Sequence, residues 1–155
     1  MNPRSAAAVL VMAMVATAAL ADTPLPVLYT LHCSGCHGED GKGVPSRGIP
    51  NLNDAGRYLA VAEGRQYLIE VPGVSQSALN NDIVAQLLNY MLVRFSREHL
   101  PEPFVPYSSG EVAKYRADKA SNAPSRRQAI VNQLRSRGLM SGQPYDSPSR
   151  AKDPQ

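Results

Sequence analysis

The stretch Cys33-Ser34-Gly35-Cys36-His37 carries the most information about the fold of this 155-residue chain. Two thiols three positions apart lie on one helical turn, so each can add across one vinyl group of the same haem. The residue that follows, His37, is then placed to bind the iron through an imidazole nitrogen. This spacing is typical of c-type haem attachment, with the histidine as proximal iron ligand. We therefore predict that Cys33 and Cys36 hold haem c covalently and that His37 is its axial ligand.

Three other kinds of site contain two cysteines at this spacing, and each fits the chain less well. A structural zinc site needs four ligands, whereas the chain has two cysteines and, besides His37, only His32 and His99. A thioredoxin-like redox pair is expected in a βαβ context, and no such pattern is visible. A plain disulfide would leave the adjacent histidine without a role. Haem attachment is the interpretation that uses both cysteines and the histidine.

The first 21 residues have the pattern of a secretory signal peptide. Arg4 supplies a positive start, Ala6 to Leu20 is apolar except for Thr17, and Ala19-Leu20-Ala21 is a small-residue cleavage site. The alternative is an uncleaved membrane anchor, but the run is shorter than the roughly 20 residues that a spanning helix needs. We expect cleavage after Ala21, a mature chain of 134 residues (155 − 21) without a stable membrane span, and a periplasmic location.

Prolines and charge divide the rest of the chain into a haem domain over 22–100, a helical extension over 101–140 and a tail over 141–155. The tail is polar and expected to be disordered. Residues 22–108 carry six basic and nine acidic side chains, a net charge of −3, and residues 109–155 carry nine and four, a net charge of +5. The basic end is interpreted as a solvated helix with a disordered tail, or as a docking surface for an acidic redox partner or an anionic membrane. Nucleic acid is not an expected partner, because no aromatic stacking pattern is present.

The pattern of apolar residues, glycines and prolines predicts an all-α domain. The expected helices cover residues 27–31, 57–62, 65–70 and about 81–95. Glycines and prolines predict an irregular loop over 38–50, and Gly64 should break the chain between the second and third helices. Asn80 or Asn81 should cap the last helix, which reaches about Phe95.

Together these features resemble a class I cytochrome c over about residues 22–96. The matching segments are Leu28-Tyr29, Cys33 to Gly38, Asp40-Gly41-Lys42-Gly43, Pro50-Asn51-Leu52 and Asn89-Tyr90. The resemblance implies a small all-α domain wrapped around one covalently attached haem, with its first and last helices crossing near the haem crevice. Here that domain would carry a short helical C-terminal extension.

The resemblance also implies specific contacts. From the first helix, Leu28, Tyr29 and Leu31 would pack against Leu87, Leu88 and Tyr90 or Met91 of the last helix. A backbone carbonyl at Ile49 or Pro50 would accept the ring N–H of His37, which fixes the tautomer of the ligand and raises its basicity.

The function that the resemblance implies is electron transfer between redox partner proteins, which needs no catalytic acid, base or nucleophile. The chain is therefore expected to be a carrier rather than an enzyme. Two alternatives remain: a haem protein with an open distal site that binds or senses small ligands, and an electron-transfer subunit of a dehydrogenase. A small peroxidase is a weaker alternative, because the chain has no second Cys-x-x-Cys-His.

The chain departs from this family at the second axial ligand, usually a methionine in the loop before the last helix. That loop, residues 71–79, holds neither methionine nor histidine, and Ser75 lies about where the thioether sulfur is expected. The side chains that remain as candidates are His32, Met91, His99 and Met140. Met91 has the position of a core residue, and His32 should point away from the distal face. We expect no sixth protein ligand, with His99 as the second choice.

The extension has two capping-box patterns. Ser108-x-x-Glu111 should open a helix that ends at about Lys119, and Ser125-x-x-Gln128 should open another that stops at Gly138. Such short helices are not stable alone, so they should pack on the haem domain or fray. A second interpretation is that their arginines bind a partner. These arginines are Arg126, Arg127, Arg135 and Arg137.

Overall fold

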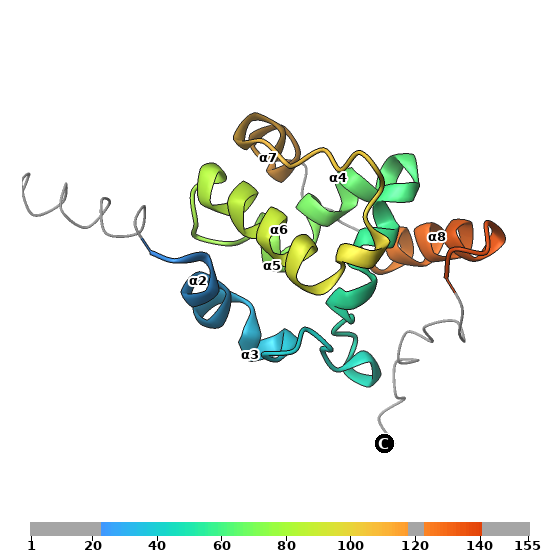
Figure 1. Cartoon of the computed structure of the whole chain (residues 1–155), viewed down its shortest axis with the longest axis horizontal. Helices are drawn as coiled ribbons and strands as arrows, with labels where there is room; N and C mark the ends of the chain where they lie inside the picture. Colours follow the sequence, from blue (N-terminus) through green and yellow to red (C-terminus); the bar gives the residue numbers. More distant parts are fainter. Residues whose placement is uncertain (1–22, 118–122, 141–155) are drawn as a thin grey trace, which may run out of the picture.

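The computed structural model describes residues 23–117 and 123–140, and most of these residues are helical (Figure 1). The helices are α2 (Leu25–His32), α3 (Ser34–His37), α4 (Ala62–Glu70), α5 (Pro72–Ser75), α6 (Asn81–Phe95), α7 (Ser109–Arg116) and α8 (Ala123–Ser136), with 3-10 segments η1 (Pro45–Arg47), η2 (Leu52–Ala60) and η3 (Arg97–His99). The strand-like structure in the described ranges is one isolated bridge between Val44 and Ile49. The prediction of an all-α fold is confirmed.

The two ends of the chain lie outside this description. The predicted signal peptide over 1–21 and the predicted disordered tail over 141–155 fall on residues that the structure does not describe. Among the residues it does describe, no helix is both long enough and apolar enough to span a bilayer.

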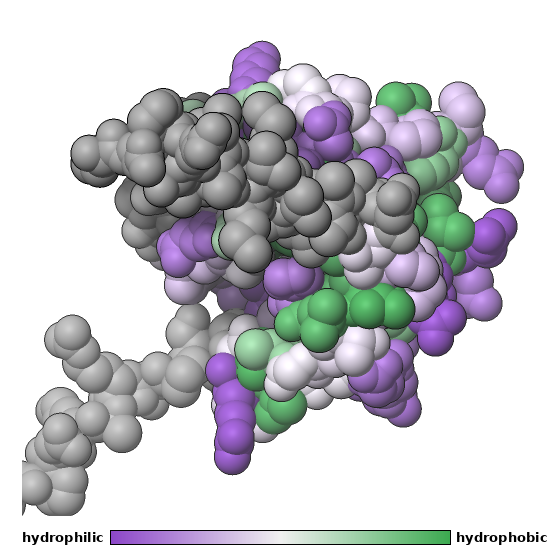
Figure 2. All heavy atoms as spheres, turned by 90° about the vertical axis from the view of Figure 1, so that its left-hand side faces the viewer, coloured by the Kyte–Doolittle hydropathy of each residue, from purple (hydrophilic) through white to green (hydrophobic). Residues whose placement is uncertain are grey.

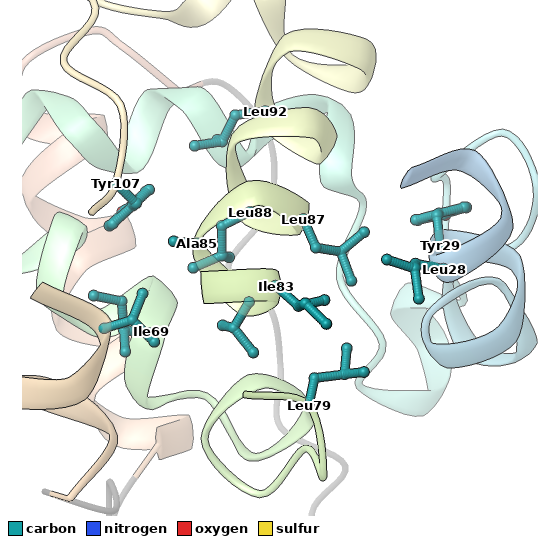
Figure 3. Close-up of a cluster of buried hydrophobic side chains, with 12 residues drawn as sticks. Leu28, Tyr29, Ile69, Leu79, Ile83, Ala85, Leu87, Leu88, Leu92 and Tyr107 are labelled. Carbon is teal, nitrogen blue, oxygen red and sulfur yellow. The ribbon is translucent and has the colours of Figure 1, made fainter. Parts of the chain in front are cut away.

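Helix α6 forms the centre of the fold, and other elements pack around it (Figure 3). Its first turn is fixed by Asn80, whose side-chain oxygen accepts a hydrogen bond from the backbone N–H of Ile83 at 2.9 Å. This confirms the predicted N-cap, and the helix ends at Phe95 as expected. Leu87 and Leu88 are 4% and 5% exposed, so adjacent faces of α6 are buried and no single amphipathic stripe suffices to describe it.

Helix α2 crosses α6 through Leu28 and Tyr29, which are buried. The ring of Tyr29 lies 5.0 Å from the ring of Phe95 and 6.5 Å from that of Tyr90, measured between centroids. The crossing of first and last helices is therefore present. Leu31, however, is 67% exposed, and the expectation that it packs against α6 is wrong. Leu31 is one helical turn beyond Val27, which is also exposed, so both side chains lie on the solvent side of α2.

The corner between η2 and α4 also differs from the expected one. The sequence predicts a break at Gly64, whereas α4 runs through this residue from Ala62 to Glu70. A Cβ atom on Gly64 would lie 1.8 Å from the carbonyl oxygen of Tyr58. The glycine therefore permits a close approach of α4 to η2 and does not interrupt the helix.

Both helices of the extension pack against the preceding part of the chain. α7 lies on α6 and α4, and α8 lies on α4 and η2. Val112 and Leu134 are 0% exposed, and Ile130 is 2% exposed. The residues of α8 form a second buried cluster with Tyr58 and Tyr67, whose rings stack at 5.8 Å. Of the two outcomes expected for these short helices, packing on the domain is the one observed.

The ends of the extension helices follow the predictions in part. Ser108 caps α7 by accepting a hydrogen bond from the backbone N–H of Glu111 at 3.2 Å. α7 is described as far as Arg116, and the predicted end at Lys119 lies outside the described residues. α8 begins at Ala123, so Ser125 lies within its first turn and the predicted cap there is wrong. The stop at Gly138, with φ of 70°, is confirmed.

Buried tyrosines predict a loss of stability in alkali. Burial is the main cause that raises the pKa of Tyr29 and of Tyr67 to about 12, from an ordinary value of 10.0. Between pH 10 and 12 the unfolded chain loses these protons and the folded chain keeps them, so stability that is complete below pH 10 falls as the pH rises through 12. Circular dichroism should show unfolding in this window, and absorbance at 295 nm should show late tyrosine ionisation. Ionisation of every tyrosine near pH 10 without unfolding would contradict the prediction.

Candidate functional site

The Cys-x-x-Cys-His motif lies on a tight helical turn at the end of α2. Cys33 joins α2 to α3: its N–H donates to the carbonyl of Tyr29 at 2.8 Å, and its own carbonyl accepts from His37 at 3.0 Å. The turn ends at Gly38, whose φ of 74° favours glycine. Cys33 is half-buried and Cys36 is exposed, and both are free thiols. The structure thus brings the three predicted site residues together on one four-residue helix and its cap.

The state of the thiols separates two interpretations of the motif. Burial, with a smaller contribution from Cys36, raises the pKa of Cys33 to about 11. Redox-active Cys-x-x-Cys pairs have the opposite property, a lowered thiol pKa that supplies a reactive thiolate. The half-buried Cys33 thiol is therefore not activated in the way that a thiol of such a redox pair is.

The ring of His37 is oriented by the backbone. Its Nδ1 atom lies 3.1 Å from the carbonyl oxygen of Pro50. A carbonyl can only accept, so Nδ1 carries the proton and Nε2 keeps its lone pair for a metal. This is one of the two carbonyls that the resemblance implied. Burial lowers the pKa of His37, against an opposing effect of the Pro50 carbonyl, and therefore favours the neutral imidazole that metal binding needs.

Two further contacts hold the backbone on either side of His37. The hydroxyl of Tyr29 donates to the carbonyl of Gly38 at 2.5 Å. The N–H of Gly43 donates to the carbonyl of His37 at 2.8 Å. Gly43 has φ of +63°, and a Cβ on it would lie 2.5 Å from the carbonyl oxygen of Pro50. The loop can therefore bring that carbonyl to the histidine ring only because residue 43 is glycine.

An open cavity of about 110 Å³, lined mainly by apolar side chains, lies beside Cys33. Its walls come from the end of α2, from α5 and the segment after it, and from α6. The lining residues are His32, Cys33, Gly73, Val74, Ser77, Ala78, Leu79, Val84, Leu87, Leu88 and Met91. None of them is an aspartate, glutamate, lysine or arginine. His32 is exposed and belongs to this lining, and Met91 lies at the wall as a side chain of α6.

The other candidate distal ligands lie elsewhere. His99 is in η3, where its Nε2 atom is 2.8 Å from Nη2 of Arg57. It lines a separate hollow together with Asp40, Arg94 and other residues. Met140 packs with the cluster of Tyr58 and α8. The structure therefore brings neither His99 nor Met140 into the cavity that contains Cys33.

Sequence reasoning missed one residue that shapes this cavity. Arg116, in the last turn of α7, donates from Nη1 to the carbonyl of Leu79 and to the side chain of Asn81, both at 2.9 Å, and from Nη2 to the carbonyl of Ser77. It thereby fixes the segment that forms one wall of the cavity. These contacts join residues at least 35 positions apart in the sequence, and no local pattern indicates them.

These observations fit a covalently held haem. The turn offers two free thiols, the histidine offers a neutral imidazole with one nitrogen available, and the adjacent cavity has an apolar wall that includes the first thiol. A macrocycle with a metal at its centre needs this combination of covalent anchor, axial nitrogen and apolar surroundings.

Comparison with known proteins gives the same result. The family model "Cytochrome c" matches residues 26–82. Two relatives, both named cytochrome c-552 and both from Thermus thermophilus, are 30% identical over 105 residues. The alignment covers 56% of this chain and 80% or 71% of the relative. No solved structure matches the chain.

Proposed function

Because this chain belongs to the cytochrome c family, and thus carries covalently bound haem c, we propose that it moves single electrons between two redox proteins in the periplasm. The periplasmic location is supported by the signal-peptide pattern of residues 1–21. The observation that supports the site most directly is the pairing of His37 Nδ1 with the Pro50 carbonyl beside the two free thiols. The bound group supplies a one-electron iron couple.

We assign the roles of the chain's own residues as follows. Cys33 and Cys36 hold the haem through their sulfur atoms, so the cofactor cannot dissociate. His37 binds the iron through Nε2, while the Pro50 carbonyl holds its other ring nitrogen and raises the basicity of the ligand. The apolar walls from α5 and α6 exclude water from the haem. Less solvent then has to reorganise when the iron changes its charge.

Pigment attachment tests this proposal. Purified exported protein should be coloured, and the colour should stay with the chain in acidified acetone, because thioether bonds survive this treatment. Replacing both cysteines, Cys33→Ala with Cys36→Ala, should release all of the pigment. A colourless wild-type protein, or one that acidified acetone strips of its pigment, would overturn the proposal.

The distal side of the iron gives a separate prediction. Residues 71–79 hold no methionine or histidine, and His99 is engaged by Arg57 outside the cavity. We expect the ferric protein to lack the weak far-red band of methionine–iron coordination, and the reduced protein to bind carbon monoxide promptly. The spectrum of His99→Ala should match that of wild type. A shift from low-spin to high-spin in this variant would identify His99 as the ligand instead.

The same open distal position supports a second candidate function, the binding or sensing of a small ligand. Carbon monoxide binding tests whether the position is open. Whether the protein serves a dehydrogenase as its electron-transfer subunit is tested by co-purification.

A further inference from the structure

Two stretches of the chain that surround the haem-attachment motif contain no charged residue. Residues 25–38 and 71–81 have no aspartate, glutamate, lysine or arginine, although 19% of the whole chain is charged. The two stretches adjoin in space, because His32 and Cys33 from the first line the same cavity as Gly73, Val74 and Ser77 from the second. We call the exposed residues of these two stretches the neutral face.

Apolar side chains project from the neutral face into solvent. Val27 and Leu31, one helical turn apart on α2, are 45% and 67% exposed, and Cys36 of the motif is also exposed. Figure 2 looks onto the side of the molecule where α2 lies and shows hydrophobic side chains gathered at its surface. Exposed apolar groups that adjoin in this way mark a contact surface more often than scattered single ones do.

Few charged residues border the neutral face, and two of them already pair with other groups of the chain. Glu39 and Asp40 follow the first stretch, and Asp82 follows the second. Asp40 forms an ion pair with Lys42 at 2.8 Å. Arg116 contacts the second stretch, where its guanidinium donates hydrogen bonds to the backbone carbonyls of Ser77 and Leu79. Among the described residues, these neighbours form no cluster of one sign that could attract an oppositely charged patch.

The arginines of α8 and of the turn that follows it lie on another side of the molecule from α2 (Figure 1), and two of them contact the rest of the chain. Arg126 pairs with the buried carboxylate of Glu70. Arg137 donates to the carbonyl of Ala60 at 2.9 Å. These contacts are internal to the chain, so the interpretation of this arginine cluster as a partner-binding surface loses its main support.

We propose that the neutral face docks an uncharged, apolar surface of a redox partner, a proposal that rests on the function proposed above. A partner that presented a charged patch here would lose the hydration of its charges and gain no opposite charge in return. An apolar partner surface gains from burying Val27 and Leu31. Covalent attachment to Cys36 would hold the haem at this face, so a partner that docks here would lie next to the haem. The interaction should depend little on ionic strength, since screening acts on charges.

Gold electrodes coated with alkanethiols test this proposal on the mature holoprotein. Three films serve as probes: a mixed film with methyl and hydroxyl ends, a carboxylate film and an ammonium film. All three films are compared in one buffer at about pH 8. Direct electron transfer should be about tenfold faster on the mixed film than on either charged film at low ionic strength, and salt should change it little.

Matched lysine variants locate the docking surface. Leu31→Lys adds a charge to the neutral face and should lower the rate on the mixed film about tenfold while raising that on the carboxylate film. Val105→Lys adds the same charge to a residue that is 62% exposed in the linker before α7, and should match wild type. The fastest transfer on a charged film, or equal effects of the two variants, would overturn the proposal. Failure of the proposed function is separate: it would appear as a chain without covalent haem and without a redox wave on any film.

Discussion

Leu134→Ala should lower the free energy of unfolding by about 2 to 5 kcal/mol, the range found when a fully buried leucine is cut to alanine. Leu134 is 0% exposed and packs in the cluster that α8 forms with Tyr58 and Tyr67. Domains of this size are stable by only about 5 to 15 kcal/mol, so this single change removes a large part of the total.

Chemical denaturation of the holoprotein, followed by circular dichroism, measures the effect. The matched control is Leu139→Ala, because Leu139 follows the same helix and is 38% exposed. It should cost well under half as much, since a partly exposed side chain has less surface to lose. If the two variants unfold at the same denaturant concentration, α8 is not packed on the haem domain in solution.

Gly43→Ala should disturb the ligand side of the haem without touching the haem itself. The new Cβ would lie 2.5 Å from the carbonyl oxygen of Pro50 and 2.7 Å from that of Ile49, at a φ of +63° that an L-residue rarely adopts. Such backbone strain costs about 1 to 3 kcal/mol. The Pro50 carbonyl must move, which weakens its hydrogen bond from His37 Nδ1. A less basic imidazole stabilises ferric iron less, so the reduction potential should rise.

Potentiometric titration and denaturation of the same samples measure both effects. Gly35→Ala is the control within the motif, because a Cβ there meets nothing within 4 Å. Its potential should equal that of wild type. A Gly43→Ala protein with an unchanged potential would show that the Pro50 carbonyl does not control the electronic state of the ligand.

The parts of the fold that could be predicted from sequence are those specified by local patterns. The Asn80 cap, the length of α6, the Ser108 cap and the stop at Gly138 each depend on residues within one or two turns. The arrangement of the first and last helices and the carbonyl partner of His37 were available through the resemblance to a family, since the residues that make these contacts are far apart in the chain.

The errors at Gly64 and Arg126 share a physical cause, which is contact between distant segments. Gly64 resembles a helix breaker in sequence, but the carbonyl of Tyr58 approaches so closely that only glycine fits in α4. Arg126 resembles a surface cation, but it pairs with Glu70, which is 1% exposed. Local sequence reports the type of a side chain and its place on a helix. It does not report which neighbour covers it.

Arg116 has a consequence for the order in which this molecule is assembled. It holds the carbonyls of Ser77 and Leu79, which belong to a wall beside Cys33. Ribosomes make a chain from its amino end, so both cysteines exist long before residue 116 does. Synthesis thus leaves an interval in which the thiols are already present and the surroundings of the pigment are incomplete. The helices made last finish the enclosure of the residues made first.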